Sequence, residues 1–167
     1  MRRARELCAP CAPLAAWLLT VLIPALLVCT PAYAANVQIF GLSDVSFGTL
    51  SSVSADVTSS QSVCAYAGLL GGRYSITASG SGSNGAFTLT NGSALLPYEV
   101  QWAGTSGQAT GTALTANAAL SGQTTLLNCL LGLTTDASLI VILRGTSLSA
   151  ATAGSYSGTL TLLIAPN

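Results

Sequence analysis

The chain has 167 residues, of which half are hydrophobic, 6% are charged and none is histidine. Without histidine the chain lacks the usual imidazole base and the commonest transition-metal ligand, so we expect no metal site and no histidine-dependent catalysis. The absence of lysine and the small number of arginines exclude the basic surface that nucleic acids require.

The N-terminus has the pattern of a signal peptide. Three arginines lie within the first five residues, an apolar run follows over 14–29, and Ala-Tyr-Ala occupies 32–34. We predict that residues 1–34 are removed on export, which leaves one domain over 35–167. A membrane anchor is the alternative, but Pro24 interrupts the apolar run. The mature part carries two arginines and four acidic residues, a formal charge of −2.

The mature part predicts strands and turns without a convincing helix. Short apolar or alternating runs recur between clusters of Gly, Ser, Asn and Thr, which is typical of a β-sandwich or barrel. The stretch 110–122 is rich in alanine, but its Gly and Thr content and its missing caps favour a loop or an irregular strand. The predicted strands span 36–42, 44–50, 60–67, 73–79, 86–91, 97–104, 123–131, 138–145 and 157–165.

The last two predicted strands differ in their patterns. The segment 138–145 is apolar at successive positions, which predicts a central strand that is covered on both faces. The segment 157–165 alternates in hydrophobicity, as a half-buried strand does. An exposed apolar strand edge invites association with another chain. The neighbour of 157–165 therefore comes either from earlier in the chain or from another molecule.

Two cysteines, Cys64 and Cys129, remain in the mature part. In an oxidising compartment two cysteines of one small domain usually pair, so we predict a disulfide. A bridge that closes a loop of this length contributes about 3 to 5 kcal/mol by the loop-entropy estimate. Two buried free thiols are the alternative.

Residues suited to catalysis or ligand binding are few. A carboxylate pair such as Asp44 with Asp136 resembles the acids of a glycosidase, but it lacks evident aromatic and polar support, and we predict no catalytic residue. Tyr98 and Trp102 lie at the same parity of one predicted strand and form a possible surface contact for a sugar or an abiotic surface. A core position for the tryptophan is the simpler interpretation, which we favour.

Several short motifs, taken in order, resemble the spore coat protein U domain, the pilin fold of archaic, Csu-type chaperone–usher pili. The resemblance extends over nearly all of the mature part. It implies an all-β, immunoglobulin-like sandwich that lacks its last strand and is completed by a strand from another subunit. The matching segments are DVSFGTL at 44–50, VCAY at 63–66, RYSITASGSG at 73–82, LLPYEV at 95–100 and AGSYSGTLTLLI at 153–164.

The resemblance also implies where a strand would enter and which partners would supply it. The expected partners are a periplasmic chaperone, an outer-membrane usher and neighbouring pilin subunits, with no cofactor and no nucleic acid. The protein would be exported through the periplasm to the cell surface as a structural or adhesive subunit. The acceptor groove would be lined by Leu139, Val141, Leu143, Leu160, Leu162 and Ile164.

The start of the mature part departs from the family's pattern. Subunits of the family begin with a donor strand well ahead of the Phe-Gly motif, whereas here only residues 35–46 precede Phe47. This favours a subunit that accepts a strand but donates poorly, at the tip of a fibre. The alternative is a short donor strand with Val37 and Ile39 as its inserted side chains. A free-standing secreted module that binds carbohydrate or a surface is the other functional hypothesis.

Overall fold

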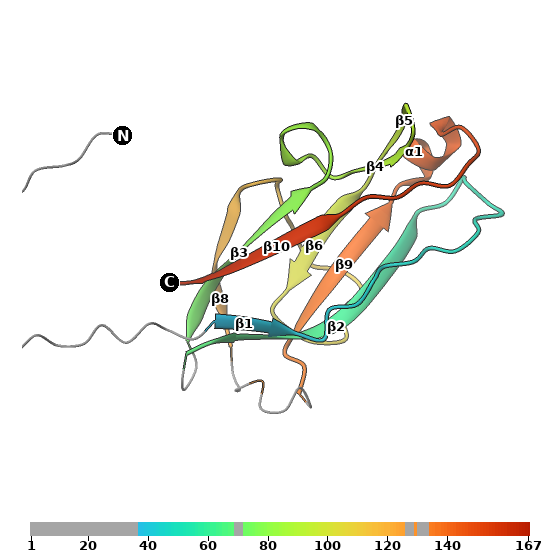
Figure 1. Cartoon of the computed structure of the whole chain (residues 1–167). Coiled ribbons are helices and arrows are strands. Elements are labelled where there is room, and N and C mark those ends of the chain that lie inside the picture. The colour runs from blue at the N-terminus through green and yellow to red at the C-terminus, as the bar shows by residue number, and fades with distance from the viewer. Residues whose placement is uncertain (1–36, 69–71, 126–128, 130–133) are drawn as a thin grey trace, which may run out of the picture. The chain divides into compact units, whose positions relative to one another are not determined.

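Two antiparallel β-sheets enclose one hydrophobic core (Figure 1). The structure, a computed structural model, describes residues 37–68, 72–125, 129 and 134–167, so the predicted signal peptide lies outside the described residues. The sheets place alternate side chains in the core, because successive residues of a strand point to opposite faces. The described residues thus form an all-β sandwich, which confirms that part of the predicted fold class.

The larger sheet has five strands in the order β1-β2-β9-β6-β7. All of its neighbours are antiparallel, and β9 lies at the centre between β2 and β6. Every residue of β9 is buried, which confirms the central strand predicted for 138–145. The strands are β1 (Val37–Phe40), β2 (Val57–Ala67), β6 (Glu99–Ala103), β7 (Thr112–Ala113) and β9 (Ala137–Leu143).

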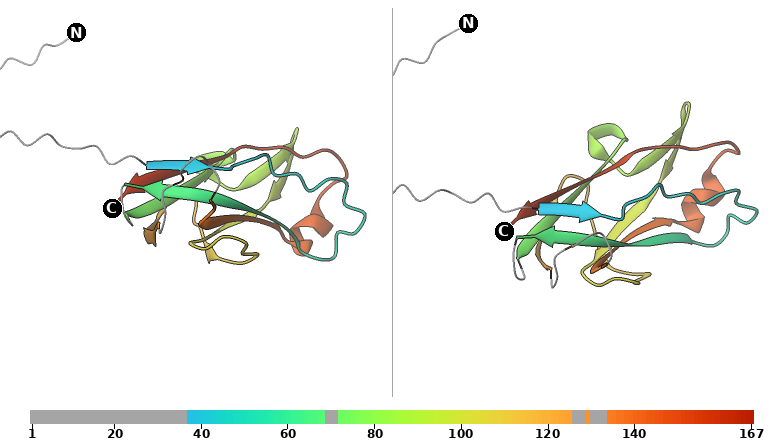
Figure 2. Two further views of the ribbon diagram at one scale, coloured as in Figure 1. Left: turned by 90° about the horizontal axis from the view of Figure 1, so that it is seen from below. Right: turned by 60° about the horizontal axis from the view of Figure 1, so that its bottom comes forward.

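The smaller sheet has three strands in the order β10-β3-β8, where β10 spans Leu160–Pro166, β3 Arg73–Gly80 and β8 Ala119–Thr124. A separate hairpin, β4 (Thr88–Asn91) with β5 (Ala94–Pro97), extends this side, because Thr90 pairs with Ser157 just before β10. A 3-10 turn at Ser83–Gly85 and the short helix α1 (Gly145–Ala150) complete the described elements. Figure 2 shows the two sheets from two further directions.

Two of the predicted strands and the absence of a helix are corrected by the structure. Residues 44–50 contain no strand, since the segment has no backbone hydrogen-bond partner among the described residues and Gly48 takes a φ of +63°. Of the strand predicted at 123–131, residues 123 and 124 end β8, which begins earlier, at Ala119, and residues 126–128, 130 and 131 lie outside the described residues. Helix α1 was missed because six residues are too few for a helical apolar period, and Leu148 is its only large buried side chain. Neither described helix is long and apolar enough to cross a membrane.

Candidate functional site

Among the described strands, β10 has a ladder partner on one edge only. It pairs with β3 from Leu160 opposite Gly80 to Pro166 opposite Tyr74. The same edge continues upstream, where the Thr90 N–H donates to the Ser157 carbonyl at 2.8 Å and the Ser157 N–H donates to the Thr90 carbonyl at 3.0 Å. On the other edge, no strand of the described chain pairs with β10. This open edge of β10 is the candidate site.

The backbone direction of β10 shows which groups face the open edge. The N–H groups of Ser157 and Asn167 donate to Thr90 and Arg73, and the Thr159 N–H donates to the Ser81 hydroxyl, so odd-numbered residues face the β3 side. Backbone groups of a strand alternate between its two edges. The N–H and C=O groups of Leu160, Leu162 and Ile164 therefore face the open edge, while Pro166 has no N–H to offer.

The side chains of the open edge are only half-buried. Leu160, Leu162 and Ile164 pack against the core but keep part of their surface exposed, whereas Leu163 points outward and is 63% exposed. The other three predicted groove residues are buried in β9 of the facing sheet and contribute to the same core: Leu139, Val141 and Leu143. The structure thus brings all six residues to one core, with β10 at its rim and β9 in its interior.

Strand β1 lies beside the C-terminal part of β10, across the open edge (Figures 1 and 2). Their Cα atoms come within 8 Å of one another, yet β1 pairs only with β2, from Val37 opposite Ala67 to Phe40 opposite Cys64. Neighbouring strands of a sheet are about 4.8 Å apart, so a strand between β1 and β10 needs about twice that spacing. A strand that enters along this part of β10 must therefore displace β1.

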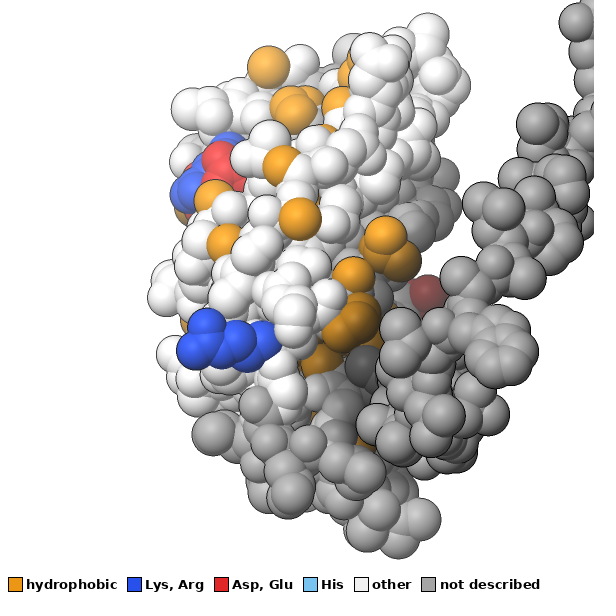
Figure 3. Space-filling view, turned by 90° about the vertical axis from the view of Figure 1, so that its left-hand side faces the viewer, with side chains coloured by type: hydrophobic (Ala, Val, Ile, Leu, Met, Phe, Trp, Pro, Cys, Tyr) orange, Lys and Arg blue, Asp and Glu red, His pale blue; other side chains and the backbone are white. Residues whose placement is uncertain are grey.

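The side chains of β1 bear on its possible role as a donor strand. Val37 and Ile39 are half-buried and pack against the chain's own core, and Phe40 is exposed. For Val37 and Ile39 to enter another subunit, β1 would have to leave β2. On the side of the molecule where β1 and the end of β10 lie, hydrophobic side chains gather at the surface (Figure 3).

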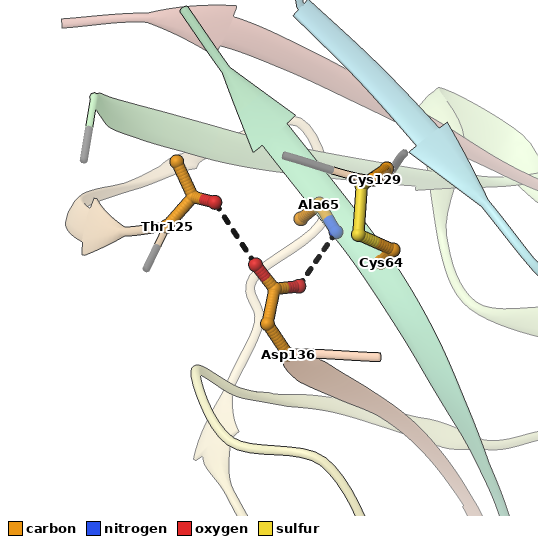
Figure 4. The surroundings of a disulfide bond; sticks show 5 residues. All are labelled: Cys64, Ala65, Thr125, Cys129 and Asp136. Atoms are coloured by element: carbon orange, nitrogen blue, oxygen red, sulfur yellow. Dashed lines mark hydrogen bonds between the residues drawn. A yellow bond between two sulfur atoms is a disulfide. The ribbon is translucent and has the colours of Figure 1, made fainter. Parts of the chain in front are cut away.

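A disulfide fixes the end of the sandwich next to β1. Cys64 in β2 is bonded to Cys129 in the connection between β8 and β9, with the two Cα atoms 5.7 Å apart, as the cysteine count predicted (Figure 4). This connection crosses from the smaller sheet to the larger one. The disulfide therefore links β2 covalently to the connection between the two sheets.

The carboxylate of Asp136 reinforces the same crossing (Figure 4). One oxygen accepts the Ala65 N–H at 2.8 Å, and the other accepts the Thr125 hydroxyl at 3.0 Å. Asp44, its proposed catalytic companion, is exposed in the segment between β1 and β2. Asp136 thus holds backbone and side-chain donors of the fold, and among the described residues no group of three or more His, Cys, Asp or Glu side chains could hold a metal ion.

Tyr98 and Trp102 do not form a surface contact, which corrects that prediction in favour of the core interpretation. Both side chains are buried, and Trp102 is only 1% exposed. The rings of Trp102 and Tyr74 are packed edge to face, with their centroids 6.4 Å apart. The indole N–H of Trp102 donates to the Tyr74 hydroxyl at 3.2 Å. Burial raises the pKa of Tyr74 to about 12. The rings of Tyr98 and Phe87 pack together with their centroids 5.7 Å apart, and burial also raises the pKa of Tyr98.

A charged cluster lies where β9 ends. The guanidinium of Arg144 donates to Asp56 at 2.6 Å and to Glu99 at 2.5 Å, and the other Asp56 oxygen accepts the Gly145 N–H at 2.9 Å. The Gly145 N–H and then Arg144 lower the pKa of Asp56, and the bond from Arg144 lowers that of Glu99. Local sequence pattern does not indicate this cluster, because Arg144 is 88 positions from Asp56 and 45 positions from Glu99.

No protein-family model matches the chain. No curated protein matches it in sequence. Among solved structures, the chain is similar to one described as a chaperone–tip adhesin complex that activates the biogenesis of CFA/I fimbriae. The identity is 18% and the TM-score 0.48, over 79% of this chain and 43% of the other, so the chain spans less than half the length of the one it matches. Similarity at this level concerns the fold alone.

Proposed function

We propose that the protein is a non-catalytic subunit of an exported surface fibre, whose incomplete sandwich accepts a β-strand from another polypeptide at the open edge of β10. The observation that carries the proposal is the combination of unpaired backbone and half-buried apolar side chains at Leu160, Leu162 and Ile164. The resemblance of the sequence to the spore coat protein U domain supports the same role.

Addition of a strand would pair the free backbone of this edge and cover its half-buried apolar side chains at the same time. The added backbone would pair with the N–H and C=O groups of β10, and alternate apolar side chains of the added strand would cover Leu160, Leu162 and Ile164. An edge without such cover is prone to unspecific pairing between chains. Strand β10 carries no charged residue, so no charge of its own protects this edge.

The proposed partners are a periplasmic chaperone, an outer-membrane usher and the neighbouring subunits. A position at the fibre tip is the specific form that we favour, because β1 is engaged by β2 and its apolar side chains pack on their own core. If residues 35–41 are instead a donor strand, their deletion should leave the subunit able to join fibres while the next subunit fails to attach. A tip subunit should lose neither property.

The test of the open edge supplies the missing strand in the same chain. We would express the chain with its own N-terminal segment and compare it with a variant that carries, after Asn167, one glycine and seven alternating threonine and valine residues. Asn-Gly favours the two-residue hairpin turn, so the addition can fold back along β10 and displace β1 from beside its C-terminal part. The original chain should oligomerise or aggregate, and the variant should be monomeric in size-exclusion chromatography.

A matched pair of substitutions locates the effect on the inward face of β10. Leu162→Asp places a charge among half-buried apolar side chains, while Leu163→Asp changes an outward, exposed neighbour. In the strand-added variant, Leu162→Asp should restore oligomerisation and Leu163→Asp should not. A stable, monodisperse monomer of the original chain, unaffected by the added strand, would refute the proposal. A free-standing binding module predicts that outcome, although the burial of Tyr98 and Trp102 removes its expected ligand face.

A further inference from the structure

The chain contains the dipeptide Asn-Gly twice, at Asn84–Gly85 and at Asn91–Gly92. The first pair lies in the 3-10 turn after β3, and the second closes the hairpin of β4 and β5. We infer that Asn91 is a modification site, at which the side-chain amide is lost spontaneously, whereas hydrogen bonds protect Asn84. This site is independent of strand acceptance, and its chemistry needs only water.

The reaction is an attack of a backbone nitrogen on a side chain. The Gly92 nitrogen forms a bond to Cγ of Asn91, the Cγ–Nδ2 bond breaks, and the proton of the Gly92 N–H leaves through solvent with the ammonia that is released. Water then opens the cyclic imide. Opening at the side-chain carbonyl gives aspartate, and opening at the main-chain carbonyl gives isoaspartate, whose main chain runs through Cβ and Cγ. Glycine favours the attack because it has no Cβ to restrict the approach of its nitrogen.

The nitrogen of Gly92 is free to take part in this reaction. Asn91 lies opposite Ala94, so Gly92 is the first of two turn residues, and its φ of +62° is that of the glycine in a type II′ turn. Among the described residues, the Gly92 N–H has no hydrogen-bond acceptor. Gly92 is exposed, and a Cβ added there meets nothing within 4 Å. The nitrogen therefore turns toward Cγ of Asn91 without losing a hydrogen bond of its own.

The peptide between Asn84 and Gly85 is held on both sides. The Gly85 N–H donates to the Gly82 carbonyl at 3.1 Å. The Asn84 carbonyl accepts the side-chain amide of Asn117 at 2.7 Å. A Cβ added at Gly85 would collide with the side chains of Asn117 and Ser79, so this peptide is also enclosed. Rotation of the peptide breaks both bonds, which makes the reactive conformation at least roughly tenfold rarer.

Solvent exposure of the two side chains gives the opposite ranking. Asn84 is exposed, whereas Asn91 is half-buried. If access of water to the amide controlled the reaction, Asn84 would react first. If the hydrogen bonds of the following peptide control it, Asn91 reacts first. One chain thus contains a matched pair of sites that separates the two causes.

Loss of the Asn91 amide affects the hold of the hairpin on the chain that leads into β10. This amide lies directly against the backbone of Gly154, because a Cβ added at Gly154 would collide with it. The neighbouring Thr90 exchanges two backbone hydrogen bonds with Ser157, at 2.8 and 3.0 Å. Either product places a charge on this half-buried contact, and isoaspartate also lengthens the main chain beside Thr90. Modification should therefore weaken the bridge to Ser157.

The first test ages the original chain at mildly alkaline pH in water enriched in heavy oxygen and follows both sites by peptide mass spectrometry. Chymotryptic cleavage after Phe87 separates the two sites, in monomers and oligomers alike. In the folded chain, Asn91 should take up the label at least roughly tenfold faster than Asn84, and in denaturant the two rates should be similar. Equal rates in the folded chain, or a faster rate at Asn84, would overturn the inference. So would a preference for Asn91 that persists undiminished in denaturant.

The second test removes one of the protecting bonds. Asn117→Gly takes the amide donor away from the Asn84 carbonyl, and glycine accepts the φ of +61° at this position. Labelling of Asn84 should become roughly fivefold faster, while that of Asn91 should not change. An unchanged rate at Asn84 would mean that its hydrogen bonds do not protect it, which contradicts the inference.

The third test measures the effect on the hairpin by amide hydrogen exchange. After ageing, the amides of Thr90 and Ser157 should exchange at least roughly fivefold faster than in the fresh chain. Asn91→Gln is the control, because closure of a larger ring is slow, and its exchange should not change with age. Unchanged exchange at both amides of the aged original chain would refute the weakened bridge, and the modification site would then rest on the labelling.

Discussion

Strands β9 and β10 are both seven residues long and both rich in leucine and isoleucine, yet their surroundings differ. β9 has ladder partners on both edges, and all of its residues are buried. β10 has a partner on one edge, and none of its residues is fully buried. Apolar content thus does not distinguish a core strand from an accepting strand. The number of neighbouring strands distinguishes them, since each edge without a neighbour leaves backbone groups unpaired and side chains partly exposed.

The outer faces of the two strands differ as well. A loop after β6 covers the outer face of β9, where the Ser138 hydroxyl accepts the Gln108 N–H at 3.0 Å and donates to the Thr105 carbonyl at 2.9 Å. The same loop is joined to β2 by the Gly107 N–H, which donates to the Ser62 hydroxyl at 2.9 Å. On β10, Leu163 remains 63% exposed. The outer face of the central strand β9 is therefore covered by a loop, whereas the outer face of β10 is exposed to solvent.

The largest effect is expected at Trp102, which lies opposite Leu139 of β9. Trp102→Ala removes a fully buried ring and the hydrogen bond to Tyr74, and should lower the free energy of unfolding by about 4 kcal/mol. Chemical denaturation measures this loss. Leu95→Ala, at a position that is 65% exposed, is the control and should change it by less than about 0.5 kcal/mol. A small effect of Trp102→Ala would mean that the centre of the larger sheet is not the rigid part.

The comparison becomes quantitative with the same substitution in both strands. Leu139→Ala in β9 should cost about 3 kcal/mol, because it leaves a cavity in the core. Leu162→Ala in β10 should cost about 1 kcal/mol, because its side chain is only half-buried. Both free energies of unfolding are measured in denaturant. In the strand-added variant the cost of Leu162→Ala should approach that of Leu139→Ala, and a cost that stays low would show that the added strand does not cover this edge.

A smaller effect is expected at the start of β9. Asp136→Ala takes the acceptor from the buried Ala65 N–H and should cost about 2 kcal/mol of unfolding free energy. Asp44→Ala removes an exposed carboxylate and is the matched control. Thermal unfolding of both variants checks the difference. Equal melting temperatures of the two variants would mean that the hydrogen bonds of Asp136 do not stabilise the connection between β8 and β9 beside the disulfide.

The smallest effect concerns the charged cluster at the end of β9, which has no counterpart on β10. The lowered pKa values of Asp56 and Glu99 mean that their pairing with Arg144 stabilises the fold above their ordinary values of 3.8 and 4.5 and is lost as pH falls below them. The melting temperature of Arg144→Gln should therefore lie slightly below that of the original chain at pH 7, and the difference should shrink as pH falls through the lowered pKa values of Asp56 and Glu99. Added salt should reduce the difference at pH 7. A difference in melting temperature that does not shrink as the pH is lowered would mean that Arg144 acts through packing and not through its charge.

Several features followed directly from local pattern. The continuous apolar run at 138–145 predicted a central strand, and the alternation at 157–165 predicted a half-buried one; both strands exist, as β9 and β10. The even cysteine pair predicted the bridge between Cys64 and Cys129. The possible ligand face at Tyr98 and Trp102 failed, because parity on a strand places two residues on one face without saying whether that face is inside.

Sequence alone determined which segments are apolar, which alternate and which residues can take part in chemistry, because these are properties of neighbouring residues. Tertiary structure alone decided that, within the described parts of the chain, β10 pairs with one strand and 44–50 with none, and that Arg144 meets Asp56 and Glu99. Ladder partners and ion pairs join residues that are distant along the chain, so local pattern does not specify them. The open edge of β10 is a property of that arrangement.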